Sequence, residues 1–373
     1  MIDTLATGGA EMSLLEISSR LQAFTPVVCV LTSRNSDLKE AFLKKHVEIV
    51  NLDVNPKLWW IEGTRKLKQI IDSVRPDIVH ATLFKSEIVT RIALWRSGIP
   101  HIGSFVNDSY ANNRYKHQGF IRNMKLNVVR LADAITARYV THFMSISQAI
   151  AESNAKALRL DKRKITCIYR GRNVNGFPVF HPSRNTTPFT FLTVARLLKR
   201  KGYLELFQAA SGLAEKGYDF RLLIAGDGGD YNLFKKFVLK LNIQERVEFL
   251  KNRSDVPELL ARSHCFVFPS HYEGQGGALV EAMLAAKPII ASDIPVFREQ
   301  ITDDVTGKLF QVFNSSALES KMRWIIDNYE EGIALGLHAR ETAIIRFNIE
   351  NTVRLHETLY TQILQQTSSV NKN

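Results

Sequence analysis

The sequence predicts an α/β protein with two doubly wound, Rossmann-like parallel-sheet domains in tandem. Its 373 residues exceed the ~250–300 residues at which a single hydrophobic core usually stops growing. Short β-branched runs alternate with helical patterns along the chain, which is typical of parallel sheets covered on both faces. A stretch rich in Gly, Pro, Asn and Ser, residues 171–188, interrupts this alternation and is interpreted as the interdomain linker.

Six segments before the linker are predicted to be strands: Pro26–Leu31, Val47–Leu52, Asp77–Ala81, His101–Val106, Phe143–Ile146 and Lys164–Ile168. Apolar residues at helical spacing predict helices between them, such as Glu62–Ser73 and Glu87–Ser97. A glycine turn, Thr7-Gly8-Gly9-Ala10-Glu11, comes before any full strand. Because about 5–6 strand residues are usual in that place, we expect that the first strand is truncated or that the chain begins late.

The alternation restarts after the linker. Strands are predicted at Phe189–Ala195, Phe220–Ala225, Val247–Leu250, Cys265–Phe268 and Pro288–Ala291, and helices at Leu204–Glu215, Tyr231–Leu241, Pro257–Ala261, Ala278–Ala285 and Ile349–Leu364. We expect an N-terminal domain of residues 1–172, completed by the closing helix (350–373), and a C-terminal domain of residues 173–349. Two such domains are expected to face a central cleft and to bind the ligand there, outside the carboxyl ends of the strands.

The composition excludes several classes of protein. A hydrophobic content of 45% with 23% charged residues is ordinary for a globular protein and argues against disorder. The 3 cysteines are far apart and lack metal-ligand spacing, which favours a reduced, cytoplasmic compartment. No apolar run approaches the ~18–20 residues that cross a bilayer, and the N-terminus does not resemble a signal peptide.

The net charge of +12 is concentrated in the first half of the chain. Residues 1–172 carry 26 Lys and Arg against 15 Asp and Glu, which is +11, and residues 173–373 carry 23 against 22, which is +1. Basic and apolar residues are interleaved between residues 112 and 143: Arg114, Tyr115, Lys116, Phe120, Ile121, Arg122, Met124, Lys125, Leu126 and Arg130. This pattern is typical of an interfacial helix on an anionic membrane surface. The alternative is a surface helix whose apolar side lies in the core.

The most informative stretch is Phe268–Met283, in which Glu273 and Glu281 flank a Gly-Gln-Gly-Gly turn. Glu273 lies in the loop after a buried strand, and Glu281 about one turn inside the next helix. Glycines allow the backbone to approach a ligand closely, and the bare amides of a helix N-terminus bind anions such as a diphosphate. A carboxylate close by can accept hydrogen bonds from ribose hydroxyls.

A second element follows the first strand of the C-terminal domain, where Arg196 and Lys201 are five residues apart. Two fixed cations can neutralise a diphosphate leaving group without a metal, and such charge stabilisation is worth several kcal/mol per donor, about 3–4 in one measured case. The alternative is that the run Lys199–Lys201 forms a solvated turn.

These elements together resemble family 4 glycosyltransferases of the GT-B fold. The resemblance is carried by the Arg-x4-Lys pair, the Glu-x7-Glu element, Ala225-Gly-Asp-Gly228 and the Gly-Gly-Ala-Glu turn. It implies a hexosyltransferase that needs neither cofactor nor metal and retains anomeric configuration. The enzyme would move sugar from a nucleotide-diphosphate donor, held by the C-terminal domain, to a lipid-linked or polysaccharide acceptor at the N-terminal domain. The implied route is front-face attack, in which the departing phosphate takes the acceptor's proton.

The resemblance also implies roles for single residues. Arg196 and Lys201 would bind the donor diphosphate, and Glu281 would hold the ribose hydroxyls. Glu273 would face the transferred sugar, so that Arg196, Lys201 and Glu273 form the catalytic set. Other donor-binding residues would be Gly8, Gly9, Gly274, Gln275, Gly276, Gly277, Ala278 and Leu279.

The sequence departs from the family pattern near the reacting sugar. Asn107 stands where many members have a His, and Asn hydrogen-bonds a hydroxyl but cannot take a proton. Thr82 stands where a second His is common. His80 is a candidate for the sugar or acceptor side, and a structural His at a strand end is the alternative.

Other functions of this fold are alternatives to transfer. A sugar-nucleotide epimerase shares the two-domain fold but not the Arg-x4-Lys and Glu-x7-Glu pairing, and a catalytically silent nucleotide-sugar-binding protein is a further alternative. A dehydrogenase is disfavoured because no Gly-x-Gly-x-x-Gly follows a strand. No nucleic-acid-binding motif accompanies the basic half. The sequence therefore predicts a cytoplasmic transferase, peripheral on the cytoplasmic face of a membrane if the basic segment binds lipid.

Overall fold

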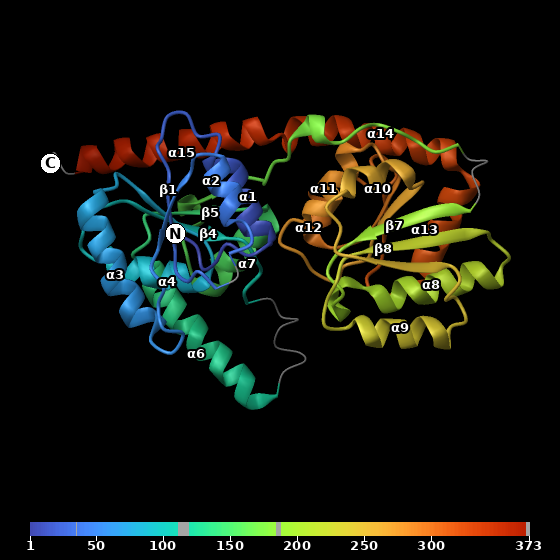
Figure 1. Ribbon diagram of the computed structural model, residues 1–373, viewed down its shortest axis with the longest axis horizontal. Helices are drawn as coiled ribbons and strands as arrows, with labels where there is room; N and C mark the ends of the chain where they lie inside the picture. Colours follow the sequence, from blue (N-terminus) through green and yellow to red (C-terminus); the bar gives the residue numbers. More distant parts are fainter. Residues whose placement is uncertain (35, 111–118, 184–187, 371–373) are drawn as a thin grey trace. The chain divides into compact units, whose positions relative to one another are not determined.

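The computed structural model describes the chain except residues 35, 111–118, 184–187 and 371–373 (Figure 1). It divides into two compact units, Met1–Gly171 with Ile349–Asn373, and Arg172–Asn348. The chain passes from one unit to the other twice. The boundaries expected from the sequence, after residues 172 and 349, each lie one residue from the boundaries of these units. Each unit has its own parallel sheet and its own core.

The first unit contains six short parallel strands. These are β1 (Val27–Val30), β2 (Glu48–Asn51), β3 (Val79–Ala81), β4 (His101–Phe105), β5 (His142–Ser145) and β6 (Ile165–Cys167). β1 pairs with β2, and β3-β4-β5-β6 form a second ladder. All six match segments that the β-branched runs predict.

The N-terminal residues bridge these two ladders. Ile2 forms parallel bridges with Val30 and with Thr82, and its amide donates to the Cys29 carbonyl over 2.9 Å. The Met1 ammonium donates to the His80 carbonyl over 2.8 Å. A segment too short to be assigned as a strand therefore occupies a strand position, between β1 and β3.

Helices cover this sheet. They are α1 (Gly9–Ser18), α2 (Lys39–Lys44), α3 (Trp59–Val74), α4 (Phe84–Ala93), α6 (Phe120–Ala137), α7 (Gln148–Leu158), the 3-10 turn η1 (Lys162–Lys164) and the closing helix α15 (Ile349–Val370). The closing helix belongs to this unit because its buried residues Leu359, Tyr360 and Ile363 pack with core residues of the strands. The N-terminal unit is thus completed by the end of the chain (Figure 1).

The second unit has a six-stranded parallel sheet in the order β12-β11-β10-β7-β8-β9. Its strands are β7 (Phe189–Val194), β8 (Phe220–Ala225), β9 (Val247–Lys251), β10 (Cys265–Phe268), β11 (Ile289–Ser292) and β12 (Lys308–Phe310). Its helices are α8 (Tyr203–Glu215), α9 (Tyr231–Lys240), α10 (Val256–Arg262), α11 (Gly277–Leu284), α12 (Pro295–Arg298), α13 (Ser315–Asp327) and α14 (Tyr329–Arg346), with 3-10 turns η2 (Val174–Gly176) and η3 (Lys199–Lys201).

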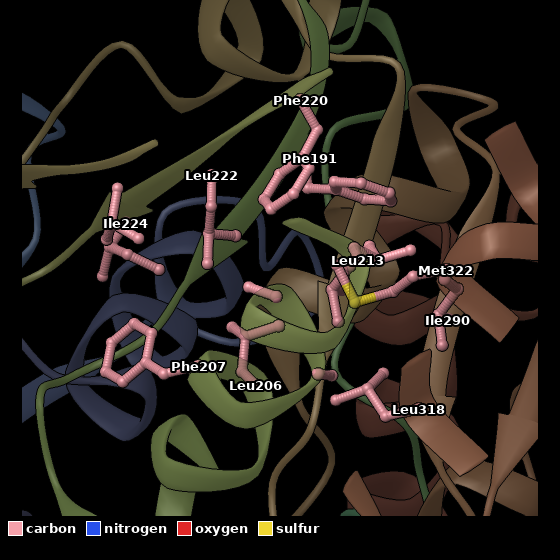
Figure 2. Close-up of a cluster of buried hydrophobic side chains, with 14 of the residues drawn as sticks. Phe191, Leu206, Phe207, Leu213, Phe220, Leu222, Ile224, Ile290, Leu318 and Met322 are labelled. Atoms are coloured by element: carbon pink, nitrogen blue, oxygen red, sulfur yellow. The ribbon is translucent and has the colours of Figure 1, made fainter. Parts of the chain in front are cut away.

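The core of the second unit explains why these segments fold as they do. Figure 2 shows Phe191 of β7 and Leu222 and Ile224 of β8 close to Leu206 and Phe207 of α8. Alternate residues of a strand and residues three or four apart on a helix lie on one face, so both patterns bury the same side. Each fully buried side chain of this kind contributes about 1.5–3 kcal/mol relative to an exposed one.

The strand order decides where a site can form. The chain runs from β7 outward to β9, then returns to β10 on the other side of β7 and continues to β12. The order therefore reverses between β7 and β10. In doubly wound sheets ligands bind outside the carboxyl ends of the strands at such a switch point, and both predicted motifs follow these two strands.

Candidate active site

The loops after β7 and β10 are packed against each other. The amide of His271, after β10, donates to the Arg200 carbonyl over 2.9 Å. Gly202 has a φ of +72°, and a Cβ atom there would lie 1.9 Å from the Pro269 carbonyl oxygen. Only glycine fits this close approach of two backbones. The two motifs are thereby brought together.

Lys201 and Glu273 form an ion pair across these loops. The Lys201 side chain is 9% exposed and that of Glu273 is 11% exposed. The Lys201 ammonium also lies 5.5 Å from the centre of the Phe268 ring. Burial lowers the pKa of Lys201, the Glu273 carboxylate opposes this, and the nearby charges of Arg200 and Arg196 lower the pKa further. The structure therefore does not fit the solvated-turn alternative for Lys201.

Arg196 lies beside this pair but is exposed. Its charge acts on Lys201, and no carboxylate pairs with its guanidinium within the described part of the chain. A guanidinium with five donors and no carboxylate partner is suited to bind the oxygens of a phosphate.

The glycine turn before α11 is shaped by its neighbours. Gly276 caps the helix with a φ of +83°, and a Cβ atom there would lie 2.8 Å from the Phe297 ring. Gln275 is buried and its carbonyl accepts a hydrogen bond from the Gln300 side chain. The Leu279 amide already donates to the Gly276 carbonyl over 2.9 Å. The amides best placed for an anion are thus those of the first turn, at Gly277 and Ala278.

Glu281 has a partner that the sequence analysis missed. Its Oε1 accepts from Nε of Arg172 over 2.8 Å, and both side chains are about one-fifth exposed, at 20% and 22%. The guanidinium lies over the first turn of α11, where a Cβ atom at Gly277 would come within 2.2 Å of it. Arg172 and Glu281 are 109 residues apart, and no spacing rule connects them. The one signal in the sequence is that Arg172 stands at the start of the predicted linker.

The glycine pair of the first unit opens a helix. Gly8 is the N-cap of α1 with an extended backbone, and a Cβ atom on it would lie 2.3 Å from the Glu11 carboxylate. Gly9 is the first residue of α1, and Nη1 of Arg170 lies 3.7 Å from its Cβ position. Glu11 is buried. The turn therefore places Gly8 and Gly9 at a helix start, with the Glu11 carboxylate lying against Gly8.

His80 and Asn107 differ in their surroundings. Both ring nitrogens of His80 are engaged, Nδ1 with the Tyr360 hydroxyl and Nε2 with the Ser104 hydroxyl, each at 2.7 Å. Burial, followed by the neighbouring charges, sets the pKa of His80 well below its usual value. This arrangement fits the structural alternative. Asn107 is exposed after β4, and its carbonyl accepts from the Asn154 side chain over 3.1 Å.

Two features are absent from the described residues. Across residues 1–370, outside the gaps at 35, 111–118 and 184–187, no three His, Cys, Asp or Glu side chains are grouped to hold a metal ion. No helix in that part of the chain has the length and apolarity of a membrane span.

Two family models account for most of the chain. The model of glycosyl transferases group 1 matches residues 179–342, and that of glycosyltransferase family 4 matches residues 7–175. An uncharacterised glycosyltransferase of Methanocaldococcus jannaschii is 32% identical over 283 residues, which are 74% of this chain and 72% of that relative. The chain is a family 4 glycosyltransferase. The predicted family and enzyme class are thereby confirmed.

Further relatives of this glycosyltransferase are named for polysaccharide or lipid-linked substrates. The UDP-Gal:α-D-GlcNAc-diphosphoundecaprenol α-1,3-galactosyltransferase of Escherichia coli is 26% identical over 79% of this chain and 77% of its own. Among solved structures, Anabaena HepE in complex with UDP aligns with a TM-score of 0.82 and 21% identity over 96% of this chain and 98% of HepE. The sucrose-phosphate synthase of Thermosynechococcus elongatus aligns with a TM-score of 0.81 and 17% identity over 98% of this chain and 96% of its own. These likenesses confirm the GT-B fold class.

Proposed function

We propose that this glycosyltransferase transfers a sugar from a nucleotide-diphosphate donor without a metal and with retention of anomeric configuration. The observation that carries the proposal is the grouping of Arg196, Lys201 and the N-terminus of α11 at the switch point between β7 and β10. Three sources of positive charge at one sheet edge are suited to a diphosphate.

The arrangement acts on the charge that develops during the reaction. As the bond between the anomeric carbon and the diphosphate oxygen breaks, negative charge grows on the leaving group. Lys201 is already held by Glu273, so it need not reorganise when this charge appears, and fixed charges of this kind commonly make the largest catalytic contribution. Arg196 is exposed and can close on the phosphates when the donor binds.

The Glu273 pairing supports the front-face route. A carboxylate that attacks the anomeric carbon must be unpaired and close to that carbon, whereas Glu273 is occupied by Lys201. Its second oxygen can accept a hydrogen bond from a sugar hydroxyl. In the proposed route the acceptor hydroxyl attacks on the face that the diphosphate leaves, and the departing phosphate oxygen takes the hydroxyl proton.

We propose a lipid-linked or polysaccharide acceptor on the basis of the relatives. The Escherichia coli relative is named for a diphosphoundecaprenol acceptor, and so is a Campylobacter jejuni relative that is 25% identical over 74% of this chain. An enzyme that uses such a substrate has to work at a membrane surface.

Helix α6 supplies a surface of suitable chemistry. Its N-terminal half projects beyond the other elements of the first unit (Figure 1). Five apolar side chains along it are exposed by 51–65%, at steps of three and four residues: Ile121, Met124, Val128, Leu131 and Ile135. This exposure does not fit the alternative in which the apolar side lies in the core. Arg114, Tyr115 and Lys116 of the predicted basic segment lie outside the described residues.

The charge around this apolar row is positive. Arg122, Lys125, Arg130 and Arg138 are exposed along the helix and at its C-cap, and the one acid in the helix, Asp133, is buried and paired with Arg91. Trp95 and Tyr139 are 59% and 62% exposed. Their ring centres lie 6.3 Å apart near the C-terminal end of α6. Apolar, basic and aromatic side chains in this arrangement are typical of a helix lying in an anionic lipid surface. We therefore propose peripheral binding to the cytoplasmic face of a membrane.

One assay tests the chemistry. The full chain is incubated with a panel of nucleotide sugars and GlcNAc-diphosphoundecaprenol in detergent or vesicles, with and without EDTA, and the anomeric configuration of the product is read by NMR. The proposal expects transfer with retention at the same rate in EDTA. Interconversion of the free nucleotide sugar would instead indicate an epimerase, and binding without turnover of any donor a silent protein.

A further inference from the structure

Arg172 occupies an unusual electrostatic position. Its guanidinium lies against the first turn of α11, in space left by Gly277. A helix N-terminus carries partial positive charge, so a cation there is disfavoured unless an anion compensates it. The Glu281 carboxylate, from the next turn of the same helix, is the compensating anion.

The main chain also holds Arg172 in place. Its amide donates to the Phe347 carbonyl over 2.8 Å, and the residue forms a parallel bridge with Asn348. Arg172 is therefore anchored both through its backbone and through Glu281.

We propose that Arg172 is a positioning residue for the donor ribose. Its Nε holds Oε1 of Glu281, and no donor reaches Oε2 among the residues described. Oε2 is then fixed as an acceptor for a ribose hydroxyl. A glutamate on a helix otherwise samples several rotamers and loses this freedom on binding, and anchoring it beforehand removes that cost. The inference rests on the proposed function and on the role that the family resemblance implies for Glu281, which is to hold the donor ribose.

The test compares ribose and dideoxyribose ligands. Isothermal titration calorimetry first gives the Kd of UDP and of GDP for the full-length protein. The nucleotide that binds more tightly is then compared with its own 2′,3′-dideoxy form. Hydrogen bonds to a charged group predict that the dideoxy form binds about 10–100-fold more weakly to the wild type. Arg172→Ala should raise the Kd of the ribose ligand by about tenfold and leave the Kd of the dideoxy ligand unchanged. Arg172→Lys should recover part of the loss.

Two further variants separate the outcomes. Glu281→Gln should reduce the preference for ribose, and Arg172→Ala should add little to Glu281→Gln because the two residues act as a unit. The matched control is Arg221→Ala, which breaks the surface pair with Glu248 on the strands β8 and β9 of the same unit and should change neither Kd.

Each failure has its own signature. If Glu281→Gln reduces the preference for ribose but Arg172→Ala weakens both ligands equally, Arg172 does not act through Glu281 and the inference is overturned. If Glu281→Gln leaves the preference unchanged, the assignment of the ribose to Glu281 fails and the role of Arg172 fails with it. Unchanged affinity for the dideoxy ligand shows that the Arg172→Ala variant is folded.

Discussion

The ammonium of Lys201 and the carboxylate of Glu273 form a nearly buried ion pair that links the loops after β7 and β10, two neighbouring strands at the centre of the sheet. A surface pair would contribute little to stability. A buried pair costs desolvation energy, so its value here lies in holding a cation where negative charge develops.

Lys201→Ala should reduce kcat by on the order of a hundredfold or more, as loss of a transition-state charge partner does. It should also reduce the free energy of unfolding by about 1–3 kcal/mol, because Glu273 is left largely buried without its partner. Steady-state kinetics and urea denaturation measure the two effects. Lys236→Ala, on the neighbouring helix α9, serves as the control and should change neither. Full activity in Lys201→Ala would contradict the assignment.

Arg196→Ala should separate catalysis from stability. The side chain is exposed, so its removal should leave the midpoint of urea unfolding unchanged within about 0.5 kcal/mol. Turnover should still fall on the order of a hundredfold. Arg196→Lys should restore part of the activity, because a single ammonium lacks the forked geometry that matches a phosphate. Loss of stability equal to that of Lys201→Ala would show that Arg196 has a structural role.

The sequence predicted the two motifs at this site, but neither the pairing of Lys201 with Glu273 nor that of Arg172 with Glu281. β8 was predicted with the bounds that the structure shows, because a run of apolar residues bounded by turn residues is a local signal. Arg172 was missed because it meets Glu281 only after folding. The strand β12 has three residues, Lys308–Phe310, and was missed because so short a run carries no periodicity.

The sequence also could not show whether the apolar side of α6 is buried or exposed. A row of apolar residues at helical spacing is the same whether it faces a core or solvent, and only the structure shows which. His80 illustrates the same limit, since the two hydroxyls that bond its ring come from residues 24 and 280 positions away.

Membrane binding should depend on both the apolar row and the charge of α6. The double variant Met124→Glu with Val128→Glu should abolish co-sedimentation with vesicles that contain a quarter phosphatidylglycerol, and binding by the wild type should weaken as salt rises. Ile345→Glu is the control, because Ile345 is an apolar residue on α14 of the second unit that is even more exposed, at 72%. Equal binding to vesicles of phosphatidylcholine alone would contradict the electrostatic part of the proposal.

The first unit should lose stability in acid because it buries neutral histidines, among them His80 and His356. Burial lowers the pKa of His356 from its usual value to about 4. The unfolded chain binds a proton below a pH of about 6.5, whereas the folded chain stays neutral until about pH 4, so stability falls as the pH drops through this window. The loss is at most about 1.4 kcal/mol per pH unit for one proton.

His356→Asn should make that dependence less steep, and the contribution of His80 should remain. The amide can still donate to the Thr352 carbonyl, which His356 Nδ1 contacts at 2.8 Å, but it does not titrate. Urea unfolding of the first unit, followed between pH 7 and pH 4 in the wild type and the variant, measures the difference. Parallel curves for the two proteins would show that His356 is not the group responsible.

The most direct measurement is a crystal structure of the protein with a bound nucleoside diphosphate. The two phosphates are expected within hydrogen-bond distance of the Arg196 guanidinium, the Lys201 ammonium and the amides at the start of α11. Phosphates bound elsewhere, with Arg196 and Lys201 unchanged, would contradict the account.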